Sequence, residues 1–199
     1  MNRSGFRRAG MLLALLVTLV PASLTAAPAA EWNLGALMQS LAKNKSGKAT
    51  FVERKYIALL DKPVESSGDL LYVAPDRLEK RTRKPKPESM VLDKDTLTVE
   101  QGRKRYSVAL PDYPEIAAFV ESIRGTLSGD RQALERVYRL ELRGSPERWQ
   151  LNLQPIDAKM VAVVSHIRIS GAHSEVQTIE IIQADGDRSV MQISTEPAR

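Results

Sequence analysis

The sequence predicts an α+β protein whose antiparallel sheet has about ten short strands and curls or closes on itself. The first observation is a series of short runs rich in β-branched and aromatic residues, separated by polar turns that contain Gly, Pro or Asp. The second is an amphipathic helical pattern ahead of the first run, and the third is a longer helical pattern in mid-chain. With no repeat of fixed period and no linker, one domain is expected.

Residues 1–29 have the composition of a secretory signal peptide. Three arginines precede an apolar run, 11–20, which is shorter than the roughly 20 residues that cross a membrane. Ala27-Pro28-Ala29 follows, so cleavage is expected near Ala29, with Ala26 as the alternative. A retained membrane anchor is the competing interpretation, which the short run and the proline after it disfavour.

Cysteine is absent, which excludes a disulfide framework and the cysteine-containing lipobox of a lipoprotein. A signal peptide without cysteine is typical of a bacterial periplasmic protein that its core alone stabilises. Removal of the signal peptide leaves residues 30–199, enough chain for one domain with a sizeable core.

The basic character of the chain is local. The formal net charge of +5 falls to about +2 once three arginines leave with the signal peptide, which weakens a nucleic-acid interpretation. Residues 77–86 hold six Lys or Arg side chains against a single Glu. This segment is either a solvated strand face or a docking patch for anionic lipid or an acidic partner. The candidate docking residues are Arg77, Lys80, Arg81, Arg83, Lys84 and Lys86.

The first half of the chain predicts one helix followed by strands. A helix is expected over 33–42, where Asn33 can cap the first turn and apolar residues recur at helical spacing. Strands are then expected over 49–60, 68–73, 77–84, 89–92, 96–100 and 103–110. Pro85 and Pro87 exclude a central strand position between the third and fourth of these.

The middle of the chain predicts two helices. Pro114 suits the first position of a helix, and an apolar stripe continues from it to Leu127. Gly125 is expected to end or weaken this helix, and a second helix is expected over 130–137. Strands then resume, over 139–143, 148–154, 160–170, 176–183 and 189–193. Asp185-Gly186 is the clearest hairpin signal in the sequence.

Residues typical of catalysis or metal binding are scarce. The two histidines, His166 and His173, have no cluster of other metal-binding residues near them in the sequence. A cysteine nucleophile, a G-x-S-x-G motif, a phosphate-binding loop and an obvious carboxylate pair are all absent. We therefore expect no metal, no cofactor and no catalytic residues, and we favour a binding protein over an enzyme.

Alternating apolar residues predict an apolar face under the helices. Leu70 and Tyr72 must point to one side of their strand, as must Trp149, Leu151 and Leu153 of theirs. If the helices fill the space above this face, the residues are ordinary core. If they do not, the face is the wall of a lipid cavity. The alternation of side chains along a strand cannot distinguish the two, so both interpretations stay open.

Several motifs occur in an order that points to one family. They are Ala49-Thr50-Phe51-Val52-Glu53, Gly68-Asp69-Leu70-Leu71-Tyr72 before Pro75, Asp93 with Thr96-Leu97, Leu151-Asn152-Leu153-Gln154-Pro155 and the Asp185-Gly186 turn. Together with the leading helix and the secretion signal, this order resembles the LolA-type periplasmic carriers of lipoproteins, and more closely their divergent LolA-like branch. The resemblance covers most of the chain after the signal peptide.

This resemblance implies an unclosed, half β-barrel with the N-terminal helix and the mid-chain helices as a lid on its concave face. It implies a monomeric carrier of the acyl chains of lipoproteins, or of a related lipid, between an inner-membrane release complex and an outer-membrane acceptor. The residues expected to form the lipid-binding cavity and lid are Phe51, Leu70, Tyr72, Leu78, Ile116, Phe119, Val120, Ile123, Trp149 and Leu151.

The chain departs from the family pattern at the strand-end proline. Ala74 stands where the family has a basic residue that helps to hold the lid shut, and the aromatic residue that often follows the proline is missing. Lys94 replaces the glycine of the middle turn. A LolB-like acceptor is the near relative, but that role implies a membrane anchor. A non-carrying envelope binding module and an enzyme acting on periplasmic lipid or polysaccharide are the alternative functions.

Overall fold

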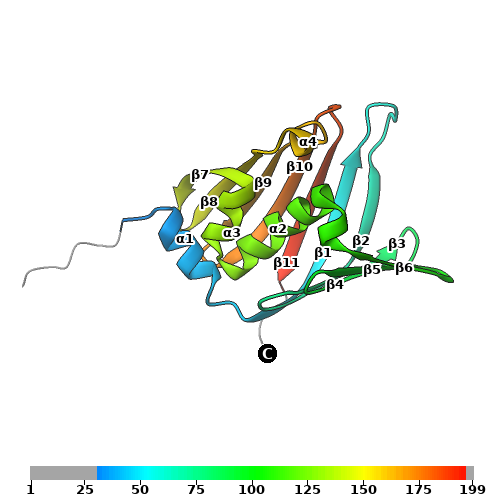
Figure 1. Ribbon diagram of the computed structural model, residues 1–199, viewed down its shortest axis with the longest axis horizontal. Helices are drawn as coiled ribbons and strands as arrows, with labels where there is room; N and C mark the ends of the chain where they lie inside the picture. The colour runs from blue at the N-terminus through cyan, green and yellow to red at the C-terminus, as the bar shows by residue number, and fades with distance from the viewer. Residues whose placement is uncertain (1–30, 196–199) are drawn as a thin grey trace, which may run out of the picture.

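One antiparallel sheet of eleven strands forms the body of the protein, in the order β6-β5-β4-β3-β2-β1-β11-β10-β9-β8-β7. The computed structural model describes residues 31–195, so the expected signal peptide lies outside the described residues. The sheet curves around helices that lie on its concave side (Figure 1). Its two edge strands, β6 and β7, do not pair, so the barrel is open and the predicted half-barrel α+β fold is confirmed.

The helices and strands follow the order expected from the sequence. The helices are α1 (Leu34–Leu41), the 3-10 helix η1 (Leu110–Asp112), α2 (Pro114–Ser128), α3 (Arg131–Val137) and α4 (Ala158–Val161). The first strands are β1 (Ser46–Tyr56), β2 (Val64–Val73), β3 (Arg77–Lys84), β4 (Glu88–Asp93), β5 (Thr96–Gln101) and β6 (Lys104–Ala109). The later strands are β7 (Tyr138–Ser145), β8 (Arg148–Pro155), β9 (Val164–Ala172), β10 (Glu175–Gln183) and β11 (Arg188–Thr195).

One expectation about a helix and two about strands were wrong. Gly125 neither ends nor breaks α2, which continues to Ser128. The glycine is needed there because a Cβ atom would lie 2.9 Å from Leu134 of α3, so its absence lets the two helices approach. The helix ends at Gly129 instead, whose φ of 69° is the left-handed conformation of a helix C-cap.

Two strands begin or end at residues other than those predicted from the sequence. The start of the expected strand 160–170 is helix α4, because Asp157 caps it by accepting hydrogen bonds from the backbone of Lys159 and Met160. The expected strand 49–60 stops at Tyr56. Beyond it the backbone N–H of Ala58 donates to Asp187 at 2.9 Å, which ties the β1–β2 loop to the β10–β11 turn.

The strand register places one row of side chains across the concave face. From β7 to β2 the paired residues of this row are Leu142, Leu151, Ile169, Ile179, Met191, Glu53 and Ser66. The row is apolar as far as β11 and becomes polar at β1 and β2. Since side chains in one row share a face, Glu53 points to the same side as the core residues.

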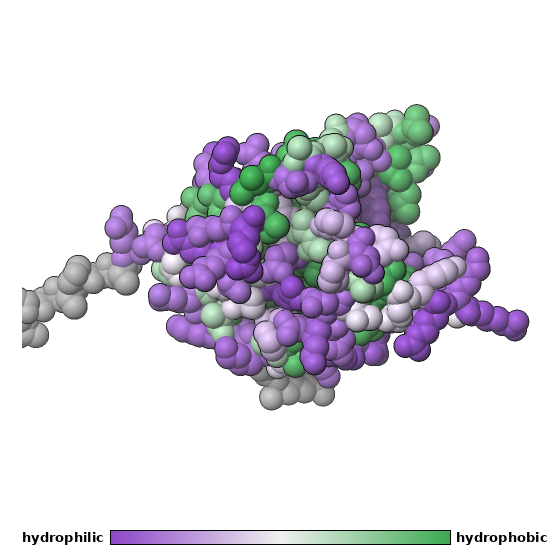
Figure 2. Space-filling view, in the orientation of Figure 1, coloured by the Kyte–Doolittle hydropathy of each residue, from purple (hydrophilic) through white to green (hydrophobic). Residues whose placement is uncertain are grey.

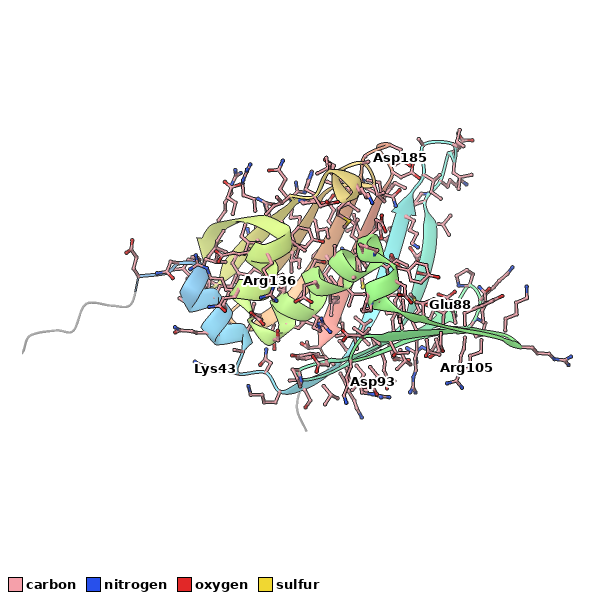
Figure 3. The ribbon with its side chains drawn as sticks, viewed as in Figure 1. Lys43, Glu88, Asp93, Arg105, Arg136 and Asp185 are labelled. Carbon is pink, nitrogen blue, oxygen red and sulfur yellow. The ribbon has the colours of Figure 1, made fainter. Side chains whose placement is uncertain are left out.

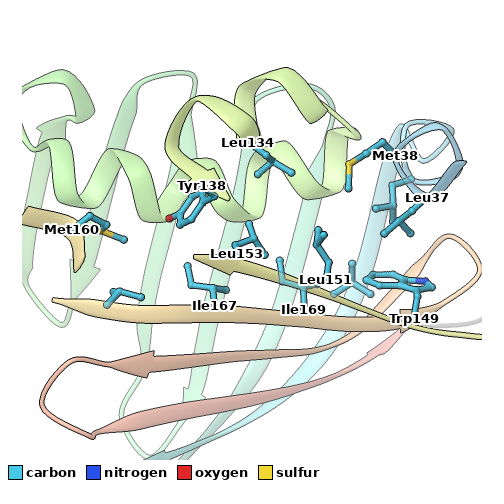
Figure 4. Close-up of a cluster of buried hydrophobic side chains, with 13 residues drawn as sticks. Leu37, Met38, Leu134, Tyr138, Trp149, Leu151, Leu153, Met160, Ile167 and Ile169 are labelled. Atoms are coloured by element: carbon cyan, nitrogen blue, oxygen red, sulfur yellow. The ribbon is translucent and has the colours of Figure 1, made fainter. Parts of the chain in front are cut away.

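The packed core occupies only one half of this concave face. Figure 4 shows α1 and α3 covering the strands β7 to β9, with Leu37, Leu134 and Leu151 fully buried between them. Asn33 caps α1 through a hydrogen bond from the backbone of Ala36, as predicted. Trp149 closes the core near α1, and its indole N–H donates to the carbonyl of His173 at 3.1 Å.

The two mid-chain helices connect the two edges of the sheet. Strand β6 at one edge leads through η1, α2 and α3 to β7 at the opposite edge. This connection must therefore cross the open side of the half-barrel (Figure 1). Its outward surface is largely hydrophilic (Figure 2). None of the helices among residues 31–195 is long and apolar enough to span a membrane.

Candidate functional site: an apolar cavity beneath helix α2

A cavity of about 1570 Å³ lies in the half of the barrel that the core does not fill. Its floor comes from β1 to β5, β10 and β11, and its roof is α2. Its apolar lining residues include Leu70, Tyr72, Leu78, Met90, Leu92, Leu97, Phe119, Val120, Ile123, Leu127, Ile179, Ile181, Met191 and Ile193. The volume exceeds the range of about 300–1,000 Å³ that is usual for small-molecule pockets.

The predicted cavity residues separate into two groups. Leu70, Tyr72 and Leu78 on the sheet line the cavity, as do Phe119, Val120 and Ile123 on α2. The other four do not. Trp149 and Leu151 belong to the packed core, and Ile116 is 37% exposed in the first turn of α2. Phe51 is buried on the same face of β1 as Glu53, beneath the ammonium of Lys80, and does not line the cavity.

A buried ion pair interrupts the apolar floor. The Glu53 carboxylate is 5% exposed and accepts from the ammonium of Lys80 at 2.5 Å. The hydroxyl of Ser189 donates to its other oxygen at 2.6 Å, and that of Ser66 lies 3.4 Å from the oxygen bound by Lys80. Burial alone would raise the pKa of Glu53, but the charge and hydrogen bond of Lys80, with Ser189 and Lys55, hold it below its usual value.

A second polar feature lies at the wall formed by β2. Tyr72 is 7% exposed, and its hydroxyl has no hydrogen-bond partner among the described residues. Burial, with a contribution from the charge of Asp76, raises the pKa of Tyr72. A buried hydroxyl without a partner costs free energy, so this wall can accept a polar ligand atom.

Arg124 attaches the roof to the rim of the barrel. It extends from α2, pairs with Glu121 at 2.7 Å, and reaches two turns of the sheet through Asp95 at 3.6 Å and Asp76 at 4.0 Å. It also donates to the carbonyl of Lys94 at 3.2 Å. Partial burial would lower the pKa of Arg124, but Glu121, Asp76 and Asp95 outweigh it and raise that pKa. Position 74 on the barrel, where the resemblance implied a basic residue, is an alanine, and the basic residue at this rim is Arg124 on the helix.

The basic segment 77–86 does not form one solvent-exposed patch. Strand alternation turns Lys80 toward the cavity and its neighbours Arg77 and Arg81 to the opposite face. There both arginines bind Glu79, which is 5% exposed. Burial would raise the pKa of Glu79, yet the hydrogen bonds and charges of the two arginines keep it below its usual value.

The rest of the segment is more open. Arg77 also pairs with Asp93 at 3.1 Å, and Arg83 with Asp69 at 3.2 Å. Figure 3 shows Asp93 pointing away from the helices, on the outer face of the sheet. Lys84 and Lys86 are exposed at the end of β3 and in the turn that follows it. They are the part of the predicted docking patch that is free to meet a partner surface.

Sequence reasoning missed several cavity residues. Met90, Leu92 and Leu97 lie on β4 and β5, and the strand alternation that places them beside Leu78 could have identified them. Arg124 had no comparable signal, because its partners lie in turns that only the tertiary structure brings together. Residues 31–195 contain no group of three or more His, Cys, Asp or Glu side chains that could hold a metal ion.

Solved structures with a similar chain trace have low sequence identity. A LolA superfamily protein from Nitrosomonas europaea is 9% identical with a TM-score of 0.43, over 82% of this chain and 92% of that one. The lipoprotein LppX from Mycobacterium tuberculosis is 12% identical with a TM-score of 0.42, over 83% and 96%. In the MucA/MucB complex of Pseudomonas aeruginosa, the similar chain is 14% identical with a TM-score of 0.48, over 83% and 58%.

The family assignment comes from the sequence match. None of the curated proteins matches the chain significantly. A family model described as "Outer membrane lipoprotein carrier protein LolA-like" matches residues 26–195, which is nearly all of the chain after the expected signal peptide. The half-barrel, the lid-like connection between its edges and the apolar cavity agree with that match. The chain therefore belongs to the family of LolA-like outer membrane lipoprotein carrier proteins.

Proposed function

We propose that this protein is a periplasmic carrier that encloses acyl chains, of a lipoprotein or a related lipid, in the cavity beneath α2. The observation that carries the proposal is the apolar cavity of about 1570 Å³ in a member of a carrier family. In this role the protein receives cargo from an inner-membrane release complex and delivers it to an outer-membrane acceptor. It is a binding protein and carries out no chemical step.

The driving force for cargo binding is the transfer of acyl chains from water into the cavity. Each buried methylene contributes about 0.8 kcal/mol, so twelve contribute about 10 kcal/mol before the costs of association. A carrier must also release its cargo, and an open cavity with a movable roof allows this. Roof residues Phe119, Val120 and Ile123 meet the cargo on one side, while Arg124 holds the same helix to the rim.

The first test asks whether the cavity holds lipid. The protein without its signal peptide is purified from a periplasmic extract, extracted with organic solvent and analysed by mass spectrometry. The delipidated protein is then titrated with the neutral apolar dye N-phenyl-1-naphthylamine, whose fluorescence rises in apolar surroundings. We expect a co-purifying acylated molecule and saturable dye binding. A protein that is empty and binds no dye would be a non-carrying binding module instead.

The second test asks whether α2 is the roof. A Val120→Asp substitution puts a charge on the cavity side of the helix, so dye affinity should fall at least tenfold, because an unpaired charge in an apolar site is costly. Val163→Asp is the control, since Val163 is 51% exposed and does not line the cavity. If Val120→Asp lowers the melting temperature but leaves dye binding intact, the α2 stripe is plain core.

A further inference from the structure

The ion pair between Glu53 and Lys80 is an unusual feature of a cavity meant for acyl chains. Apolar residues at both positions would line the cavity without any cost of burying charges, and buried ion pairs rarely add net stability. Both side chains lie on the cavity face of the sheet, with Met191 paired to Glu53 on one side and Met90 paired to Lys80 on the other. Stability therefore does not explain why these charges are there.

The surroundings fix Glu53 but leave Lys80 with free donors. Both carboxylate oxygens of Glu53 are engaged, one by Ser189 and the other by Lys80 and Ser66. An ammonium group has three N–H donors, and Glu53 is its only hydrogen-bond acceptor among the described residues. The ammonium also lies 4.9 Å from the centre of the Phe51 ring, which steadies it on the floor.

The charge around the pair is positive on balance. Glu53 lies within reach of two lysines, Lys80 and Lys55, and the charge of each lowers its pKa. Over the whole cavity wall the charges balance, since Glu53, Glu79, Glu175 and Asp187 line it together with Lys48, Lys55, Lys80 and Arg188. The Lys80 side chain is 24% exposed, so its ammonium is partly desolvated and still open to the cavity.

We propose that Lys80, positioned by Glu53, binds the anionic headgroup of an amphiphile whose chain extends along the apolar part of the cavity. The ligand group is a carboxylate or a phosphate, both of which accept hydrogen bonds from a lysine ammonium. This inference rests on the proposed function, and it narrows the cargo from any acylated molecule to one with an acidic headgroup. The chain of such a ligand would lie along Leu70, Met90 and Leu92, beneath α2.

Competition against the neutral dye tests this anchor separately from the cavity. Delipidated wild-type protein loaded with N-phenyl-1-naphthylamine is titrated with dodecanoate and dodecyl phosphate below their micelle concentrations, and with 1-dodecanol below its solubility limit. We expect at least one anion to displace the dye at a concentration at least tenfold lower than the alcohol does. The more effective anion identifies the headgroup as a carboxylate or a phosphate.

The variants assign the preference to the ion pair. The double substitution Glu53→Gln with Lys80→Met removes both charges and leaves no unpaired one, so it should bind the dye as before and lose the preference for anions. Lys84→Met is the control, because it removes the same charge from an exposed position at the end of the same strand. It should retain the preference. A direct readout in the wild-type protein is the NMR signal of the Lys80 ammonium, which should shift with the favoured anion and stay unchanged with the alcohol.

The possible outcomes separate the two proposals. If the dye binds but the anions compete no better than the alcohol, the proposed apolar binding cavity is supported and the proposed headgroup anchor is wrong. The same holds if the double variant keeps the preference, or if the Lys80 signal does not respond to either anion. If the wild-type protein binds neither dye nor amphiphile, the carrier function fails together with the anchor.

Discussion

At the scale of single residues, two glycines with left-handed backbone differ in what surrounds them. Gly129 has φ of 69° and Gly102 has φ of 61°. A Cβ on Gly129 would lie 2.2 Å from the carbonyl oxygen of Met38, whereas one on Gly102 would meet nothing within 4 Å. The first glycine thus lets the end of α2 contact α1, while the second only permits a turn.

Alanine substitutions should separate these two requirements. Gly102→Ala should cost about 1 kcal/mol, the usual penalty of left-handed backbone for a residue with a Cβ. Gly129→Ala should lower the free energy of unfolding by at least about 1 kcal/mol more, because backbone atoms must also move apart. Urea unfolding of both variants measures the difference. Equal losses would mean that α1 and α2 can shift freely against each other.

Tyr138 should make stability fall at alkaline pH. Its hydroxyl donates to the carbonyl of Ala118 on α2 at 2.9 Å, and burial raises its pKa to about 12. The unfolded chain releases this proton near pH 10. The tyrosine's contribution is therefore complete below pH 10 and is lost as the pH rises toward 12, at up to about 1.4 kcal/mol per pH unit.

The Tyr138→Phe variant tests that assignment. Its unfolding free energy, followed by urea denaturation from pH 9 to 11.5, should decline less steeply than that of the wild type. Tyr106→Phe is the control, because Tyr106 is 57% exposed, and it should follow the wild-type curve. Identical slopes for all three proteins would show that Tyr138 is not the group that titrates.

At the scale of elements, α2 is held at its two sides by different forces. One side packs Phe119 and Ile123 toward the core, and Arg124 reaches the acidic turns of the sheet at the rim. Arg124 is partly buried, so its pairs are screened less than surface ones. The resemblance led us to expect a basic residue at the position of Ala74 on the barrel, whereas the basic residue that joins this helix to the rim is Arg124 on α2.

Arg124→Met should loosen the roof without unfolding the protein. We expect faster hydrogen exchange of the α2 amides, a faster dye on-rate, and a loss of about 1 kcal/mol in stability. Arg131→Met removes an ion pair with Glu135 that is about half exposed, so it should change little. Equal exchange of α2 in the two variants would mean that Arg124 does not hold the helix.

At the scale of the whole molecule, we predict that the end where β3 and β4 meet is the part of the surface that encounters anionic partners. Lys84 and Lys86 are exposed there, whereas Arg81 covers the buried Glu79 and contributes to the fold. Replacing Arg81 by an acidic residue should therefore destabilise the protein. A test of docking that leaves the fold intact must use Lys84 and Lys86 alone. Exposed charges speed encounters with anionic surfaces but add little affinity.

Lys84→Glu with Lys86→Glu should slow delivery of a fluorescent fatty acid to anionic vesicles several-fold at low salt. The difference should shrink in high salt, since exposed charges are screened over about 8 Å at physiological ionic strength. Lys43→Glu with Lys62→Glu is the control, because it makes the same change in net charge elsewhere on the surface. If both double variants are as fast as the wild type, the lysines are only a solvated face.

Much of the architecture was readable from the sequence. Strand alternation, turn residues and the cap at Asn33 predicted nearly every element, because these signals act over a few residues. The predicted strand over 77–84 has those limits in the structure. Alternation also predicted which residues share a face, so Leu70 and Tyr72 were expected to face the helices.

Only the tertiary structure decided what covers that face and where it is empty. Leu151 and Leu70 obey the same alternation, yet α1 and α3 cover the first while a cavity lies above the second. Likewise, alternation could place Lys80 opposite Arg81, but its partner Glu53 comes from a strand two positions away in the sheet. The sequence by itself determined local conformation and family, because both depend on short-range patterns. The cavity, its ion pair and the Arg124 contact depend on packing between distant segments, which no short pattern records.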